Sequence, residues 1–184
     1  AEKRDESLQS VSQAVTAITD SEIEAKNITS FVDLSSIVPG VTVAKNEGYK
    51  TIISIRGVGN ETNQNAIAAP SVAYHMDGIF IASPFSLQTD FIDVQRIEVL
   101  RGPEGTYYGA SSVSGTVRVI TNKPSTEAFE YGADITGGSI SDGENIYTGE
   151  AVVNIPLSDT TAIRLVGWYD KANGFIDNVL TSRT

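Results

Sequence analysis

The sequence contains no cysteine and only one histidine, one methionine and one tryptophan among its 184 residues. Without cysteine there is no disulfide, no thiol nucleophile and no thiolate metal site. One imidazole, that of His75, argues against a zinc site built from several histidines. The glycines at Gly57 and Gly59 lack the third glycine of a dinucleotide-binding loop, and there is no Walker loop. We therefore predict that the chain is not an enzyme and has neither a cofactor nor a resident metal.

Positive charge is also scarce, because 13 basic side chains stand against 23 acidic ones and the net charge is −10. Nucleic-acid-binding proteins need a basic surface that displaces counterions, so no nucleic-acid partner is expected. No apolar run reaches the length of about 18 residues that a membrane-spanning helix requires. No signal peptide heads the chain, so it is expected to be cytosolic or already processed.

The beginning of the chain predicts one strand followed by two short helices. Residues Ala14–Thr19 alternate between apolar and polar side chains, which favours a strand. Ser21 and Glu24 have the spacing of a capping box, so a helix is expected to begin at Ser21. A second helix is predicted from about Ser30, with apolar residues on one face, and Pro39-Gly40 should end it.

From Val41 to Thr121 the sequence predicts short strands separated by glycine, proline, asparagine and aspartate. Asp77-Gly78 lies between two apolar runs and indicates a two-residue hairpin turn. Early helices followed by strands predict a small α+β domain. The expected strands are Val41–Val43, Thr51–Ile55, Val72–Met76, Ile79–Ile81, Arg96–Leu100 and Thr116–Thr121.

After Lys123-Pro124 the pattern changes to three longer alternating segments, Phe129–Ile135, Tyr147–Leu157 and Ala162–Lys171. Strands of about ten residues with one apolar face are typical of outer-membrane β-barrels. They are also compatible with a soluble three-stranded meander, and this stretch taken alone favours the meander because the alternation is weak. Three strands cannot close a barrel, and an open edge in lipid leaves backbone groups unpaired. If these are barrel strands, the chain is expected to be truncated at Thr184.

Four glycine-punctuated motifs follow one another between Ile53 and Pro124. Their order and spacing resemble the plug domain of TonB-dependent outer-membrane receptors. Glu104, Tyr107 and Ser114 depart from the residues usual in that family. The motifs are Ile55-Arg56-Gly57, Tyr74–Ile79, Asp93–Gly109 and Ser114–Pro124, and their structural positions are Gly57, Asp77, Gly78, Gly102, Pro103, Gly105, Tyr108, Gly109 and Gly115.

The resemblance implies an architecture and a location. Residues 1–124 would form the plug, a mixed four-stranded sheet with short helices, inside a 22-stranded transmembrane β-barrel. Residues 125–184 would form the first strands of that barrel, about three in number. The expected location is the outer membrane of a Gram-negative bacterium.

The resemblance also implies a function and partners. The complete receptor would actively import a scarce nutrient, most often an iron–siderophore complex, otherwise cobalamin or an oligosaccharide. TonB would be a partner, through a coupling segment that lies upstream of Ala1 in the family. The other expected partners are the remainder of the chain's own barrel, outer-membrane lipid and the small nutrient ligand.

Two groups of site residues follow from the resemblance. The arginines that match Arg56 and Arg101 pair with barrel glutamates in the family, a role suited to a planar, permanently charged guanidinium. Plug loops, here Gly59–Pro70 and Ala82–Thr89, supply part of the ligand pocket in the family. The candidate ligand contacts in these loops are Asn60, Asn63, Gln64, Asn65 and, first among them, Phe85.

Two other functions stay open. A soluble plug-like module for binding, adhesion or signalling would not continue past Thr184 with further amphipathic strands. A glycan-processing enzyme on a β-scaffold would show turnover, for which no catalytic motif gives support.

Overall fold

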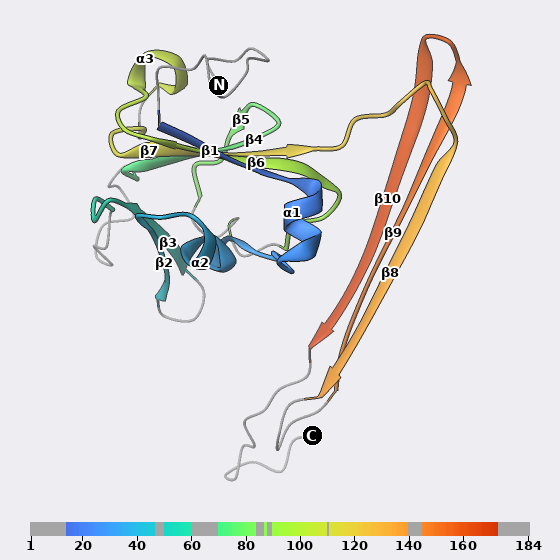
Figure 1. Ribbon diagram of the computed structural model, residues 1–184, viewed down its shortest axis with the longest axis horizontal. Coiled ribbons are helices and arrows are strands. Elements are labelled where there is room, and N and C mark those ends of the chain that lie inside the picture. Colours follow the sequence, from blue (N-terminus) through green and yellow to red (C-terminus); the bar gives the residue numbers. More distant parts are fainter. Residues whose placement is uncertain are drawn as a thin grey trace. The chain divides into compact units, whose positions relative to one another are not determined.

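The computed structural model describes residues 14–46, 50–59, 70–83, 87, 90–109, 111–139 and 145–172. The chain divides into two compact units, Ala1–Asn122 and Lys123–Thr184 (Figure 1). No helix in the described ranges is long and apolar enough to cross a membrane.

The main sheet of the first unit has five strands in the order β1-β6-β7-β4-β5. β4 and β7 are parallel and the other pairs are antiparallel, so the sheet is mixed as the resemblance implied. The implied count of four strands is wrong by one short strand, β5, which pairs with the end of β4. The strands are β1 (Ala14–Thr19), β4 (Val72–Met76), β5 (Ile79–Phe80), β6 (Val94–Arg101) and β7 (Gly115–Thr121).

The hairpin predicted at Asp77-Gly78 joins β4 to β5. Asp77 has a φ of 49° and Gly78 a φ of 84°, the two left-handed residues that a type I′ turn requires. Asp77 also reaches the neighbouring strand, where its carboxylate accepts hydrogen bonds from the backbone N–H and the hydroxyl of Thr121, at 3.1 and 2.7 Å. The turn therefore fixes the end of β7 as well as the hairpin.

The first helix, α1 (Asp20–Ala25), begins earlier than the sequence predicted. Its cap is Thr19, whose backbone N–H donates to the carboxylate of Glu22 at 3.0 Å. The expected start at Ser21 is wrong because Thr19, leaving β1 in an extended conformation, already has an acidic residue three positions on.

The second predicted helix forms as two short turns, a 3-10 turn η1 (Phe31–Asp33) followed by α2 (Leu34–Ile37). The Ser30 N–H donates to the Asp33 carboxylate at 2.8 Å and caps this segment at the predicted place. The helix ends before Pro39, as expected for a residue pair that cannot continue it.

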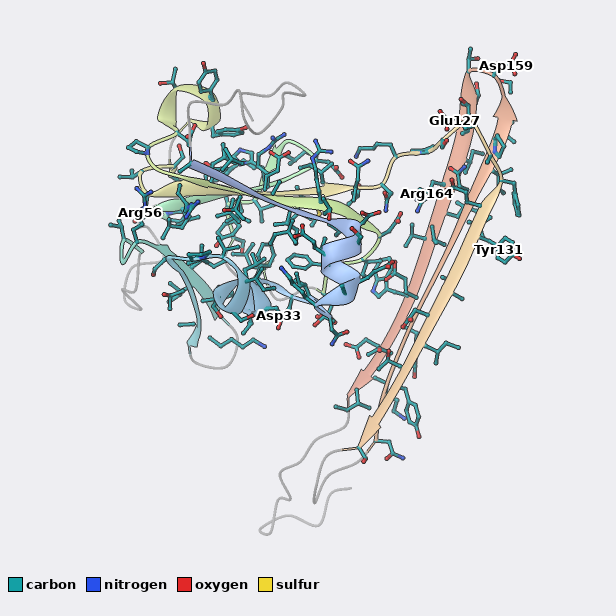
Figure 2. All side chains as sticks on the ribbon, viewed as in Figure 1. Asp33, Arg56, Glu127, Tyr131, Asp159 and Arg164 are labelled. Carbon is teal, nitrogen blue, oxygen red and sulfur yellow. The ribbon has the colours of Figure 1, made fainter. Side chains whose placement is uncertain are left out.

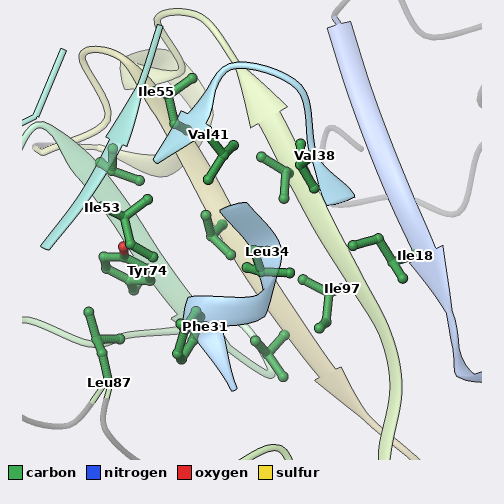
Figure 3. Packing of buried hydrophobic residues seen from close by; sticks show 14 of the residues in the cluster. Ile18, Phe31, Leu34, Val38, Val41, Ile53, Ile55, Tyr74, Leu87 and Ile97 are labelled. Carbon is green, nitrogen blue, oxygen red and sulfur yellow. The ribbon is translucent and has the colours of Figure 1, made fainter. Parts of the chain in front are cut away.

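The core of the first unit lies between one face of the main sheet and a layer made of the helical turns and a two-stranded sheet (Figure 3). This second sheet pairs β2 (Val41–Asn46) with β3 (Lys50–Ile55). Alternation along β6 sends Ile97 and Val99 into the core and Glu98 to the opposite face. Each such apolar side chain contributes about 1.5–3 kcal/mol when fully buried. The fully buried members include Ile18, Leu34, Val38, Ile55, Val72, Ile97, Val99, Val117 and Val119.

The second unit is a three-stranded antiparallel sheet in the order β10-β9-β8. One face carries apolar side chains such as Tyr131 and Leu165, and the other carries polar ones such as Glu130 and Arg164. Figure 2 shows Tyr131 and Arg164 on opposite sides of this sheet. The strands are β8 (Glu130–Ser139), β9 (Asn145–Ser158) and β10 (Thr161–Ala172), so β8 continues further than the predicted segment.

Candidate functional site

Three of the four sequence motifs meet at one end of the main sheet, whereas the Asp77-Gly78 turn of the remaining motif lies at the opposite end, beside Thr121. The Gly102 N–H donates to the carbonyl of Ser114 at 3.0 Å, and the Ser114 N–H donates to the carbonyl of Ser71 at 3.0 Å. A Cβ on Gly115 would collide with the Leu100 carbonyl and with the side chain of Ile55. The motif glycine therefore lets β3 approach the main sheet, and it brings the first motif against the last.

The two motif arginines lie at the same turn, Pro39-Gly40. The Arg56 backbone N–H donates to the Gly40 carbonyl at 2.7 Å. The Arg101 Nη1 lies 3.4 Å from the Pro39 carbonyl, a long hydrogen bond. Residues that are 45 positions apart in sequence thus become neighbours through two consecutive carbonyls of one turn.

Arg56 lies in a turn that exposes its side chain (Figure 2). It lies one residue beyond β3, with a φ of 54°, a left-handed value that is uncommon for a residue with a Cβ. The turn is closed by two backbone hydrogen bonds between Ile55 and Val58, at 3.1 and 3.0 Å. These contacts hold Arg56 in a costly conformation, which is typical of positions selected for a role other than stability.

Arg101 is the last residue of β6, one position beyond the predicted strand end at Leu100, and its guanidinium is incompletely satisfied. Its Nε is buried and has no hydrogen-bond acceptor within the described part of the chain. A guanidinium has five N–H donors, and burial of an unpaired donor is costly. The chemistry of this position fits a carboxylate from outside the described residues.

The other motif residues build the loop that follows Arg101. Gly102 and Gly109, with φ of 129° and 76°, bound a segment that holds Pro103 and the helical turn α3 (Gly105–Tyr108). Glu104 is buried, and its carbonyl accepts a hydrogen bond from the Tyr108 N–H at 2.9 Å. The loop is an ordered structural part of the unit.

The predicted ligand contacts Asn60, Asn63, Gln64, Asn65 and Phe85 lie outside the described residues. Leu87, which the structure does describe, is buried in the core beside Phe31 and Tyr74. The second predicted loop therefore contributes an anchor to the packed interior. No group of three or more metal-ligating side chains occurs in the segments that the structure describes.

A buried charge cluster on the other face of the main sheet was missed by the sequence analysis. Glu98 accepts hydrogen bonds from Arg118 Nη1 at 2.6 Å and from Arg96 Nε at 2.9 Å. Arg118 also lies over the Tyr108 ring, 5.6 Å from its centroid. Burial raises the pKa of Glu98, but the hydrogen bond from Arg96 and the charge of Arg118 outweigh it, so the pKa lies below its ordinary value.

The cluster has a sequence signal that could have revealed it. Arg96 and Glu98 occupy alternate positions of β6, and Arg118 lies opposite Glu98 in β7. Charges at every second position of otherwise apolar strands indicate one face that is polar and internally paired.

The family to which these motifs belong is shown by comparison with known proteins. The family described as TonB-dependent Receptor Plug Domain matches residues 7–116, more than half of the chain. The chain therefore belongs to this family. Its receptors are outer-membrane proteins of Gram-negative bacteria, and this is the location of the chain.

Individual receptors are similar over most of this chain. The pesticin receptor of Yersinia enterocolitica is 30% identical over 146 residues, which cover 78% of this chain and 20% of that receptor. The ferric yersiniabactin uptake receptor FyuA of Yersinia pestis is 26% identical with a TM-score of 0.56, covering 77% of this chain and 24% of that one.

P. aeruginosa FpvA, solved bound to heterologous pyoverdines, has the same fold, with a TM-score of 0.71 at 22% identity. The match covers 89% of this chain and 21% of FpvA. The chain thus spans about a fifth to a quarter of the length of the receptors that it resembles. These similar proteins are named as receptors and not as enzymes.

Proposed function

We propose that the chain is the gating part of a receptor that imports an iron–siderophore complex across the outer membrane with energy from TonB. Membership of the plug-domain family supports the transport class. The name of one similar protein, a ferric yersiniabactin uptake receptor, supports a ferric siderophore complex as the cargo. In this proposal the chain has no catalytic role, and TonB engages a segment upstream of Ala1.

The proposal assigns residues 1–124 to the plug and residues 125–184 to the first strands of the barrel. The face of the second unit that carries Tyr131 and Ile135 supports this assignment, because these side chains are 80% and 85% exposed. An apolar sheet face of this kind fits lipid, whereas the opposite face with Glu130 and Arg164 fits a polar lumen.

The observation that carries the proposal is the pair of arginines at the Pro39-Gly40 turn. Arg101 has a buried Nε without an acceptor in the described ranges, and Arg56 is held in a left-handed turn beside it. We assign to both arginines ion pairs with acidic residues of the barrel wall. A bidentate pair of this type gives both strength and a defined geometry.

The transport proposal is tested with the complete receptor in an iron-starved Gram-negative host that lacks its own siderophore receptors. Growth on a panel of ferric siderophores should be restored for at least one of them, and only when the host has TonB. Uptake of labelled cobalamin or of oligosaccharides in place of iron would assign a different cargo. Growth that does not depend on TonB would contradict the transport class.

The arginine assignment is tested separately with Arg56→Ala and Arg101→Ala. Both variants should loosen the plug and admit an antibiotic too large for porins, while Lys45→Ala, an exposed change in β2, should not. Replacement of Arg101 by Glu together with the reverse change of its barrel partner should restore the closed state. Wild-type uptake and wild-type impermeability in both alanine variants would show that the arginines do not lock the plug.

The ligand contacts are assigned to Asn60, Asn63, Gln64, Asn65 and Phe85. Amide side chains and an aromatic ring supply the hydrogen bonds and the apolar face that a chelate complex needs. Phe85→Ala should weaken binding of the ferric siderophore identified by the growth test, as measured by titration. Equal affinity of Phe85→Ala and wild type would remove Phe85 from the pocket.

A further inference from the structure

Asn154 is the most deeply buried residue of the second unit. It is fully buried, whereas every other residue of this unit in the described ranges is exposed or partly exposed. A buried amide is costly unless hydrogen bonds satisfy it. The groups that hydrogen-bond to Asn154 therefore indicate the role of this residue.

The segment that covers Asn154 is the connector Ser125–Ala128, which leads from the first unit into β8. Asn154 Nδ2 donates to the carbonyls of Ser125 and Ala128, at 2.9 and 2.8 Å, and Asn154 Oδ1 accepts from the Ser125 N–H at 2.9 Å. Both amide donors and the amide oxygen are thus used by backbone groups of Ser125 and Ala128, the first and last residues of the connector.

The neighbours of Asn154 in the sheet hold its surroundings in place. Arg164 in β10 and Glu130 in β8 lie opposite Asn154 in register. Their side chains approach each other across the middle strand, with Arg164 Nη1 3.6 Å from Glu130 Oε2. Asn154 therefore lies within a polar row on the face that carries the connector.

A second asparagine fixes the chain just before the connector, within the first unit. The Asn122 N–H donates to the Asp93 carbonyl at 3.0 Å, and Asn122 Nδ2 donates to the Asp93 carboxylate at 2.8 Å. Lys123 and Pro124 alone separate this clamp from the clamp at Ser125. Proline fixes its own φ and restricts the residue before it, so few torsions remain between the two clamps.

We propose that Asn154 is a positioning residue that sets the length of the tether between the two units. With the clamp closed, the tether is Lys123–Pro124. With the clamp lost, it is Lys123–Ala128, and its reach rises from about 7 Å to about 20 Å. The inference rests on the proposed function, in which the plug must move to open a path and then return to its seat. A short tether limits the excursion and speeds the return.

The first test is hydrogen exchange in the complete receptor. Asn154→Ala should speed exchange of the Ser125 amide about tenfold, since that amide loses its acceptor. The matched control is Asn145→Ala, which removes an exposed asparagine of the same strand whose side chain donates to the Tyr147 hydroxyl at 3.1 Å. It should leave Ser125 exchange unchanged. Equal exchange in Asn154→Ala and wild type would overturn the clamp.

The second test measures, in cells, resistance to a glycopeptide antibiotic that is too large for porins. Resistance should fall when a longer tether lets the plug close the barrel less completely. Asn154→Ala should lower resistance, and so should a Gly-Ser insertion between Lys123 and Pro124, which leaves the Asn154 clamp in place. Wild-type resistance in both variants would overturn the tether role. If Asn154→Ala does not reach the membrane, the insertion decides. Neither readout needs a siderophore, so failure of the proposed cargo does not affect them.

Discussion

The two units of the chain use similar strands in different ways. The first unit packs one face of its main sheet against helical turns and a second sheet, and Ile97 and Val99 are completely buried there. Within residues 123–139 and 145–172 of the second unit, no such layer covers the apolar face, where Ile135 is 85% exposed. Among the residues of this unit that the structure describes, the one buried position is occupied by Asn154 instead of a hydrocarbon side chain.

This difference shows what each sheet needs from its surroundings. A unit with its own core is stabilised in water because folding removes apolar surface from contact with the solvent. A sheet with an exposed apolar face gains little from its own folding, and it depends on whatever covers that face. Truncation of an apolar residue should therefore destabilise the first unit strongly and the second unit hardly at all in water.

The largest effect is expected when the core of the first unit is truncated. Ile97→Ala should lower the free energy of unfolding by about 2–5 kcal/mol, because it leaves a cavity among packed neighbours. Ile135→Ala on the exposed face should change it by less than about 0.5 kcal/mol in water. Urea denaturation followed by circular dichroism measures both. Equal losses would mean that the two sheets are packed alike.

The next effect concerns the close approach at Gly115. Gly115→Ala should destabilise the first unit by about 1–3 kcal/mol, because its Cβ would meet Leu100 and Ile55. Gly105→Ala is the matched control, since nothing lies within 4 Å of a Cβ there and alanine favours the α3 turn. In thermal denaturation, the unfolding midpoint should be lower than wild type for Gly115→Ala and not for Gly105→Ala. Equal midpoints for the two variants would argue against the close approach of Leu100 and Ile55 to Gly115.

A comparable but pH-dependent effect is expected for Glu98→Gln, which should cost about 1–3 kcal/mol at neutral pH. The folded state lowers the pKa of Glu98 below 4.5, so folding favours the carboxylate. The stabilisation is complete above pH 4.5 and is lost as the pH falls through the lowered folded value. Stability measured from neutral to acidic pH should decline less in Glu98→Gln than in wild type. Parallel declines would remove Glu98 as the cause.

The smallest effect is expected for the ion pair of the second unit. Glu130 is 57% exposed on its side chain and lies 3.6 Å from Arg164, so its charge is largely screened by water. Glu130→Gln should therefore cost about 0–1 kcal/mol. A double-mutant cycle with Arg164 measures the coupling. A coupling energy as large as that between Glu98 and Arg118 would show that the exposed ion pair of the second unit stabilises its sheet as much as the buried charge cluster stabilises the first unit.

Much of the fold could be predicted from local patterns. Alternation identified β1, and Asp77-Gly78 identified the hairpin, because both signals depend on neighbouring residues. The start of the first helix was less accurate, since Thr19 and Ser21 both offer a hydroxyl with an acidic residue three positions later, whereas the second helical segment begins at Ser30 as predicted. The short strand β5 was predicted as well, at Ile79–Ile81, because it follows the Asp77-Gly78 turn, and only the strand count implied by the family resemblance was one too low.

The site was less predictable, because its contacts join residues that are far apart in sequence. The motifs led to the prediction of Arg56 and Arg101 as site residues, but they did not predict that the turn at Pro39-Gly40 brings the two together. Asn154 was hidden in an alternating strand, where an asparagine on the polar face looks like any solvent-facing residue. Its burial depends on the connector 29 positions away, which local periodicity does not report.

The position of the one tryptophan gives the chain a built-in optical label. Trp168 lies in β10 and is 66% exposed, whereas the first unit contains no tryptophan among its residues. Indole emission therefore reports the environment of the second unit alone. Trp168 shares its face with Arg164 and Asp134, so its emission reports the polar face of this sheet. Emission that stays unchanged on transfer from buffer into detergent or bilayer would record that this face remains in contact with water, without any signal from the first unit.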